Sequence, residues 1–201
     1  MSLTNFQLED IAKRMGFPLE EPYFKDELPQ KLKTNVGYII NLEDEIDEDS
    51  GEPNSGSHWV ALYLRKYPND KVEGIYFDPF GTGLPQDVEK SVKKTLGKSI
   101  PHATKQIQDK NSSMCGWFCL AFLYYIHTYP KRTKDLYQDV SNFLGFFDDL
   151  SKDENMIKKN EYILRHFFRS DDPTKRKKID VDDYSHLENN DQAFPVGVNQ
   201  V

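Results

Sequence analysis

The residue best placed to do chemistry in this sequence is Cys115, at the start of a long apolar segment. Ser112 and Ser113 precede it, and either can cap a helix that begins there. In the first turn of a helix, unpaired backbone N–H groups and the helix dipole favour an anion, here a thiolate. Gly116 lowers helix propensity by about 1 kcal/mol relative to Ala, which suits a backbone that approaches a ligand closely. The pattern predicts a cysteine nucleophile, although Cys115 alone also fits a small buried helix residue.

A thiolate nucleophile needs a base and a group that orients the base. His58 opens a predicted strand, and Asp78 lies at the end of the next one, before the turn residues 79–81. If the two strands are neighbours, the imidazole and the carboxylate project from the same sheet. Taken singly, each residue is better explained as a histidine at a strand end or an aspartate that starts a turn. Together they predict a base and its orienting acid.

Gln108 lies seven residues before Cys115. Its side-chain amide can donate to a tetrahedral oxyanion together with the backbone N–H of Cys115. Loss of one such donor typically lowers the rate about 10²–10³-fold. Gln106 is a weaker candidate for this role.

Other chemistries fit less well. True papain order, a caspase pentapeptide, a G-x-S-x-G elbow and a Walker A loop are all missing. Cys115 and Cys119 have a spacing that zinc tolerates, but no further ligands fall at finger spacing. We therefore expect no metal or other cofactor, and expect Cys119 to pack its helix. The other histidines have no nucleophile and carboxylate nearby in sequence and are expected to be structural or exposed: His102, His127, His166 and His186.

The elements that must position these residues indicate an α+β protein. A first helix is predicted between a capping box at Thr4 and Gln7 and an end at Gly16. Both faces of the strand that follows His58 look covered. Strands are predicted over 36–42, 58–65, 74–80 and 100–108. Helices are predicted over 87–96, 115–129, 135–150 and 153–168.

Length and composition limit the class of protein that this sequence can encode. The 201 residues are 37% hydrophobic and 13% aromatic. This is enough for a hydrophobic core that needs no disulfide or metal ion to stabilise it. A net charge of −7 argues against sequence-independent nucleic-acid binding, and two cysteines suggest a reducing compartment.

The N-terminus lacks a signal peptide's apolar stretch, and the longest apolar run, 117–126, is about half a membrane span. We therefore expect a soluble intracellular protein without membrane contact. The acidic stretch 43–52 is best interpreted as a solvated loop, with attraction of a basic substrate segment as the alternative.

Composition changes after Pro173, so we predict a catalytic domain over 1–170 and a mobile tail over 171–201. The tail has too little apolar sequence to order itself alone. A disordered extension without a role is one interpretation. The other is a contact with nucleic acid or an acidic capsid partner through its basic cluster, Lys175, Arg176, Lys177 and Lys178.

Four features in order resemble the adenovirus-type maturation proteases (adenain) and, more distantly, the SUMO-specific cysteine proteases. They are SHWVA at 57–61, YFDPFG at 76–81, Gln108, and CGWFC at 115–119. Both groups have the chain order His, Asp or Glu, Gln, Cys, and the spacing from Gln108 to Cys115 is similar to the adenoviral one. The resemblance extends weakly to the N-terminus and covers roughly 1–130. Relatives occur in virophages and transposon-like viral elements.

The resemblance implies a papain-like α+β fold in which a central helix carrying Cys115 packs on a mixed sheet carrying His58 and Asp78. It implies a cysteine endopeptidase that cleaves viral capsid or core precursors near glycine, in the virion and in the cytoplasm or nucleus of the host cell. It also suggests that Trp59 forms one wall of the substrate groove. The alternative is that Trp59 packs in the core.

Two features depart from the adenoviral pattern. Asp78 stands where adenoviral proteases have Glu, and the chain is acidic whereas those enzymes are basic and use DNA and a peptide as cofactors. We therefore do not expect dependence on DNA. A ubiquitin- or SUMO-deconjugating protease would use the same four residues, and a binding module on an inactivated fold is a third possibility.

Overall fold

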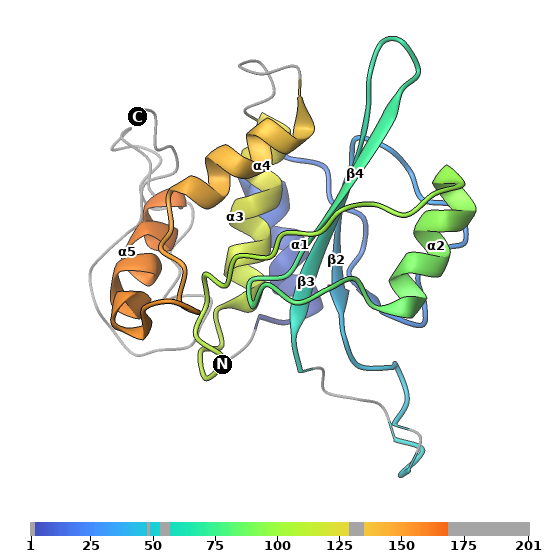
Figure 1. Ribbon diagram of the computed structural model, residues 1–201. Coiled ribbons are helices and arrows are strands. Elements are labelled where there is room, and N and C mark those ends of the chain that lie inside the picture. The colour runs from blue at the N-terminus through green and yellow to red at the C-terminus, as the bar shows by residue number, and fades with distance from the viewer. Residues whose placement is uncertain (1–2, 48, 53–56, 129–134, 169–201) are drawn as a thin grey trace.

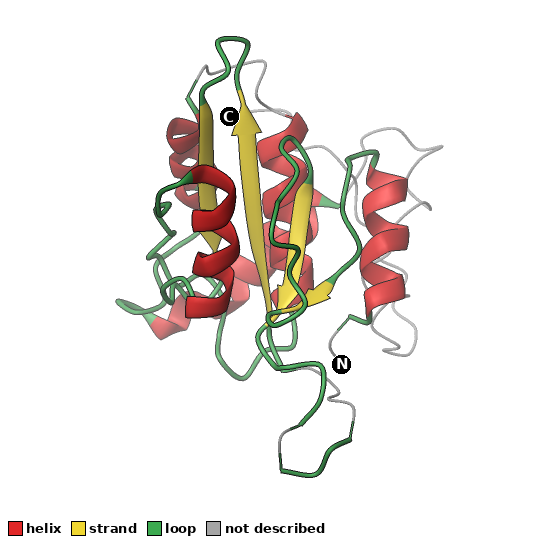
Figure 2. Ribbon diagram, turned by 90° about the vertical axis from the view of Figure 1, so that its right-hand side faces the viewer, coloured by secondary structure: helices red, strands yellow, loops and turns green. Residues whose placement is uncertain are grey.

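The computed structural model describes residues 3–47, 49–52, 57–128 and 135–168. They form an α+β domain in which a four-stranded sheet has helices on both faces (Figures 1 and 2). The strands are β1 (Tyr23–Phe24), β2 (Gly37–Asn41), β3 (Trp59–Lys66) and β4 (Val72–Phe77). The helices are α1 (Asn5–Met15), α2 (Gln86–Leu96), α3 (Cys115–Thr128), α4 (Leu136–Gly145) and α5 (Ile157–Phe167), with a short 3₁₀ helix at Glu154–Met156.

The sheet is mixed, as predicted. Its order is β1-β2-β3-β4; β1 runs parallel to β2, and the other neighbours are antiparallel. Ala61 of β3 pairs with Phe77 of β4. The strands next to His58 and Asp78 are therefore neighbours, which is the condition that the predicted base and acid required.

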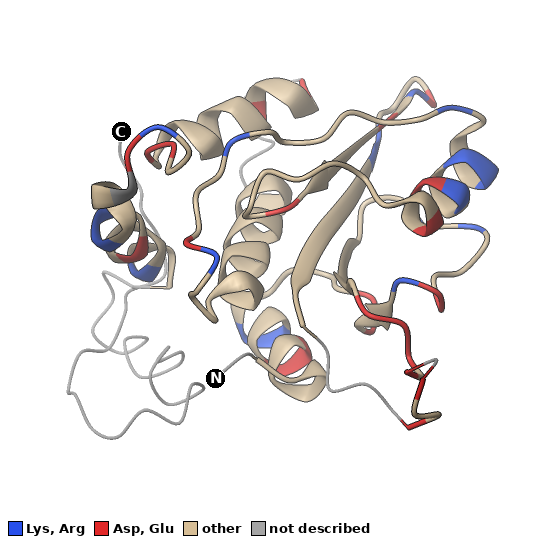
Figure 3. Ribbon diagram, turned by 60° about the horizontal axis from the view of Figure 1, so that its bottom comes forward, with Lys and Arg blue, Asp and Glu red and all other residues tan. Residues whose placement is uncertain are grey.

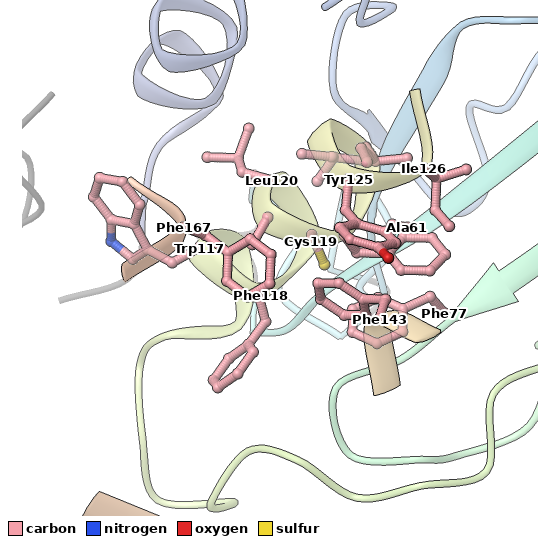
Figure 4. Packing of buried hydrophobic residues seen from close by; sticks show 14 of the residues in the cluster. Ala61, Phe77, Trp117, Phe118, Cys119, Leu120, Tyr125, Ile126, Phe143 and Phe167 are labelled. Atoms are coloured by element: carbon pink, nitrogen blue, oxygen red, sulfur yellow. The ribbon is translucent and has the colours of Figure 1, made fainter. Parts of the chain in front are cut away.

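The two faces of the sheet bury separate apolar clusters. One lies between the sheet and α1, α3, α4 and α5, and the other lies between the sheet and α2. Alternating residues of β3 feed the two clusters, because successive side chains of a strand point to opposite faces. Helix α3 is apolar nearly all round since the sheet and three helices surround it, and Phe77 of β4 stacks on Phe122 of α3. Figure 4 shows other aromatic side chains of this cluster, such as Phe118 and Phe143, packed around the helix.

Several predicted helix ends are confirmed. Thr4 and Gln7 form the capping box of α1, and Gly16 ends that helix in the left-handed conformation. Gly97 ends α2 in the same way. The helix predicted over 135–150 ends earlier, at Gly145, and just beyond it the Lys105 ammonium donates to the carbonyl oxygens of Leu144 and Phe147.

The strand predicted over 100–108 is wrong. This segment forms one isolated bridge, between His102 and Tyr76. Pro101 has no N–H to donate to a ladder, and beyond Ala103 the segment turns to contact the turn after β4 instead. Only its first residues therefore extend the sheet. The short strand β1 lies in the segment predicted only as an extended connection.

The acidic stretch is the loop between β2 and β3, and Figure 3 shows its Asp and Glu residues projecting from one end of the sheet. Within it, the Asp47 carboxylate accepts hydrogen bonds from the Asp49 and Ser50 N–H groups. These hydrogen bonds, that from the Ser50 backbone first, lower the pKa of Asp47. Within the described ranges, no helix has the length and apolar character that a membrane crossing requires.

Candidate active site

Each of the three predicted chemical residues lies at the end of a secondary-structure element. Cys115 is the first residue of α3, His58 directly precedes β3, and Asp78 directly follows β4. Antiparallel pairing of β3 and β4 places the start of one strand beside the end of the other. Rigid elements thus bring residues from three distant parts of the chain to one place.

His58 and Asp78 form a buried hydrogen-bonded pair. The imidazole Nε2 lies 2.7 Å from Asp78 Oδ1, and the Asp78 side chain is fully buried. The Phe80 backbone N–H donates to the same Oδ1 at 2.8 Å, and the Thr82 hydroxyl donates to Oδ2. A buried carboxylate is stable only when its oxygens are hydrogen-bonded. The turn that follows β4 thus supplies the donors that keep Asp78 in place.

The Cys115 side chain is the other titratable group beside the His58 imidazole. Because Nε2 faces Asp78, Nδ1 is the nitrogen left for the thiol. Burial lowers the pKa of His58, but the hydrogen bonds and negative charges of Asp78 and Cys115 outweigh burial and raise that pKa to about 9. This environment favours an imidazolium at neutral pH.

The ring of Phe80 covers the imidazole. The centroids of the Phe80 and His58 rings are 4.0 Å apart, and their planes differ by 2°. The sequence analysis did not find this contact or the hydrogen bond from Thr82. The available signal was the string from Asp78 to Thr82 itself, but residue types alone do not show that a turn folds back over the base.

Gln108 is buried in the loop before α3. Its Nε2 donates to the Ser112 carbonyl at 2.7 Å, and its Oε1 is buried with no hydrogen-bond partner in the described part of the chain. The amide has a second N–H hydrogen that Ser112 does not use. Gln106, the weaker candidate, donates to the Gln108 carbonyl instead.

The turn after β4 also holds the Gln108 loop. The Pro79 carbonyl accepts from the backbone N–H of Ile107 at 2.9 Å and from that of Gln108 at 3.1 Å. Asn160 of α5 supports the loop from the other side, because its Nδ2 donates to the Ile107 carbonyl at 3.0 Å. One turn thus contacts the acid, the base and the predicted oxyanion donor.

Trp59 and Gly116 lie against the N-terminal segment. The indole Nε1 of Trp59 donates to the Leu3 carbonyl at 2.9 Å, and Trp59 is part of the core between the sheet and α3. A Cβ at Gly116 would lie 3.2–3.3 Å from atoms of Leu8 and Leu3. Both observations favour core packing for these two residues. Their assignment to a substrate groove stays a prediction.

Cys119 lies one turn beyond Cys115 and differs from it in environment. It is fully buried, and its Sγ lies 3.3 Å from the Trp59 carbonyl oxygen, to which it donates. Burial raises the pKa of Cys119 well above its usual value, so it remains a thiol. In the described ranges, no three His, Cys, Asp or Glu side chains are grouped so that they could hold a metal ion.

The fold and the site together define an α+β protein with a cysteine at the start of a central helix, paired with a histidine and a buried aspartate. A curated protease of Bovine adenovirus 2 is 28% identical to this chain over 156 residues, which cover 68% of this chain and 72% of that protease. The resemblance to adenovirus-type proteases that the motifs predicted is confirmed, and it supports a peptidase. No family model matches the chain.

Two solved structures are also similar. The ASFV pS273R protease has a TM-score of 0.45 and 16% identity, over 81% of this chain and 67% of that one. The Xanthomonas campestris effector XopD, solved bound to ubiquitin, has a TM-score of 0.40 and 14% identity, over 80% of this chain and 89% of that one.

Proposed function

We propose that this chain is a cysteine endopeptidase whose nucleophile is Cys115, whose base is His58 and whose orienting acid is Asp78. The observation that carries the proposal is that one imidazole is hydrogen-bonded to the buried Asp78 carboxylate, at 2.7 Å, and lies beside the Cys115 side chain, which helps to raise its pKa. Nucleophile, base and orienting group in this order are the parts that thiolate catalysis requires.

The reaction follows from the protonation states. His58 takes the proton of the Cys115 thiol, and the thiolate attacks the carbonyl carbon of the scissile peptide bond. The His58 imidazolium then gives its proton to the leaving amine, so that the C–N bond breaks and a thioester remains. Neutral His58 next accepts a proton from water, whose oxygen attacks the thioester. Collapse of the tetrahedral intermediate releases the acid and the Cys115 thiolate, to which the His58 imidazolium can return its proton.

The negative charge that forms on the oxygen of the tetrahedral intermediate must be stabilised by hydrogen-bond donors. The backbone N–H of Cys115 lies in the first turn of α3, where the helix dipole favours negative charge, and the Gln108 amide lies on a loop held by Pro79. We assign these two groups to the oxyanion. Gln108→Ala should lower kcat about 10²–10³-fold with little change in KM.

The substrate we propose is a viral capsid or core precursor, cleaved near glycine, in the virion or the infected cell. Similarity to the Bovine adenovirus 2 protease supports a viral setting. Cys115 and His58 are only 3% and 9% exposed, which supports a small residue beside the scissile bond. A contact through the basic cluster at 175–178 remains part of this proposal and lies outside the described residues.

The test is to incubate the protein with a capsid precursor from its own virus and to identify the products by mass spectrometry. Discrete products should form with the parent and with Cys119→Ala, and should be absent with Cys115→Ala. Cleavage by Cys115→Ala at the parent rate would overturn the proposed nucleophile. Much faster release of a fluorophore from the C-terminus of ubiquitin or SUMO than cleavage of any precursor peptide would instead assign the deconjugating activity.

Alkylation separates an active enzyme from an inert module on the same fold. Iodoacetamide at pH 6 should modify Cys115 and leave Cys119 unmodified, because only Cys115 lies beside an imidazole at a helix start. An unperturbed cysteine, with a pKa of about 8.5, reacts slowly at that pH. Slow labelling of Cys115 at pH 6 that becomes fast only near pH 8.5 would favour the binding module.

A further inference from the structure

The contact between Phe80 and His58 is not accounted for by packing of the core. Phe80 is half-buried, and it belongs to neither of the two apolar clusters that the described residues form. Its ring instead lies flat on the imidazole, with centroids 4.0 Å apart and planes 2° from parallel. A phenylalanine outside both cores, stacked face to face on the base, calls for a role at the site.

The environment of the imidazole shows what that role can be. Among the described residues, the titratable groups that face His58 are Asp78, from the turn after β4, and Cys115, from α3. Asp78 hydrogen-bonds the edge of the imidazole, Cys115 lies near enough to raise the pKa of the ring, and Phe80 covers a face. Rotation of the imidazole about its Cβ–Cγ bond would break the hydrogen bond to Asp78 and would also drive the ring into Phe80.

The charge of the ring adds a second effect. The π face of an aromatic ring attracts a cation whose centre lies within about 6 Å of the ring centroid. Neutral imidazole gains only the weaker stacking attraction. Phe80 therefore stabilises the imidazolium more than the neutral base, in the same direction as the Asp78 carboxylate but through a different face of the ring.

We propose that Phe80 is a positioning residue of the reaction, which holds the imidazole of His58 in the plane that joins Asp78 to Cys115 and favours its protonated form. This inference rests on the proposed function. It adds to it a residue that acts through the base.

The backbone allows this role to be tested by side-chain substitution. The Phe80 N–H donates to Asp78 Oδ1, and the Gly81 N–H donates to the Asp78 carbonyl, so both turn hydrogen bonds survive a change of the Phe80 side chain. Phe80→Leu removes the π face and keeps an apolar side chain. Phe80→Tyr keeps the π face.

The experiment compares the parent, Phe80→Leu, Phe80→Tyr and a control, Tyr137→Leu. Tyr137 is 37% exposed and lies in the first turn of α4, near the end of β3 that is opposite to His58. For each, the pKa of His58 is measured by NMR titration of the imidazole, kcat and KM are measured on one precursor peptide, and the melting temperature is recorded.

Phe80→Leu should lower the His58 pKa and lower kcat about tenfold, the factor that one aromatic contact supplies, with KM and melting temperature nearly unchanged. Phe80→Tyr should restore both values, and Tyr137→Leu should change neither. If Phe80→Leu raises only KM, Phe80 lines the substrate groove and the inference is wrong. It is also wrong if Phe80→Leu leaves the His58 pKa and kcat at parent values. A parent that cleaves nothing, although its His58 pKa responds to Phe80→Leu, would instead count against the proposed function.

Discussion

A Cβ atom on Gly81 would lie 2.6 Å from the carbonyl oxygen of Thr104, so the turn after β4 and the segment leading to Gln108 meet backbone to backbone. Gly81 also has a φ of +73°, in the left-handed region that favours glycine. The close approach and the turn conformation together let a single turn contact Asp78 and the Gln108 loop. Gly81 therefore meets two requirements at once, a close contact with backbone and a left-handed conformation.

We predict that Gly81→Ala destabilises the protein and reduces activity, and Gly97→Ala is its matched control. Gly97 has a φ of +69°, but an added Cβ there would meet no other part of the described chain within 4 Å. Its change therefore costs only the left-handed conformation, about 1–2 kcal/mol. Gly81→Ala adds a clash with backbone, so its cost in the free energy of unfolding should be about 1–3 kcal/mol larger. Urea unfolding of both variants measures the difference. Equal losses would show that the contact with Thr104 relaxes freely.

The raised pKa of His58 predicts the alkaline limit of activity. Since that pKa is about 9 instead of the usual 6.5, the imidazolium that protonates the leaving amine persists through neutral pH and is lost as the pH rises through about 9. The profile of kcat/KM against pH should therefore fall above about pH 9. Asp78→Asn removes a hydrogen bond and a negative charge that raise this pKa, so the alkaline limb should move to lower pH.

Asp78→Asn should also lower kcat/KM about 10²-fold or more, as expected when the base loses its orientation. Asp139→Asn is a control for removal of a buried carboxylate elsewhere, because Asp139 pairs with Arg65 at 2.7 Å. It should reduce stability and leave the alkaline limb in place. An alkaline limb that stays near pH 9 in Asp78→Asn would show that Asp78 does not control His58.

Asn160 links α5 to the loop that carries Gln108. Besides its bond to the Ile107 carbonyl, its Nδ2 donates to the Asp148 carbonyl at 2.8 Å and its Oδ1 accepts from the Asp148 N–H at 2.8 Å. Asn160→Ala leaves buried backbone groups unpaired, which should lower the free energy of unfolding by about 2–4 kcal/mol. Well below the melting temperature kcat should still fall, because the Gln108 loop loses its support.

The control for this variant is Asn142→Ala, since Asn142 is exposed on α4 and bonds only the neighbouring Gln138 among the contacts described. It should change the free energy of unfolding by less than about 0.5 kcal/mol. Thermal unfolding and peptide cleavage at a temperature well below both melting points measure the two effects separately. If Asn160→Ala melts early but cleaves at the parent rate, Asn160 supports only the fold.

Much of the site could be predicted because its residues sit at element ends that local sequence specifies. Glycines at 16 and 97 end helices where expected, and β2, β3 and β4 lie close to the ranges that their alternating or apolar sequence predicts. Phe80 could not be predicted, because its position depends on how the turn folds back, which Gly81 permits through a contact with a segment more than twenty residues later. The surroundings of Trp59 and Gly116 depend in the same way on where the N-terminal segment packs.

The last prediction concerns the end of the catalytic domain, for which the sequence predicts residue 170. Phe167 and Phe168 are buried, and the Phe168 ring meets that of Trp117 edge-on, with centroids 4.9 Å apart. Trp117 lies in the first turn of α3, two residues from Cys115. A chain that ends after Ser170 keeps these contacts and should cleave short peptides at the parent rate.

A chain that ends after His166 loses both phenylalanines. Each buried Phe is worth about 3–5 kcal/mol, and the total stability of a domain is about 5–15 kcal/mol, so this shorter chain should be largely unfolded. Circular dichroism and peptide cleavage distinguish the two lengths. If the chain ending after Ser170 is also unfolded or inactive, residues beyond 170 belong to the catalytic domain, and the boundary must move toward the C-terminus.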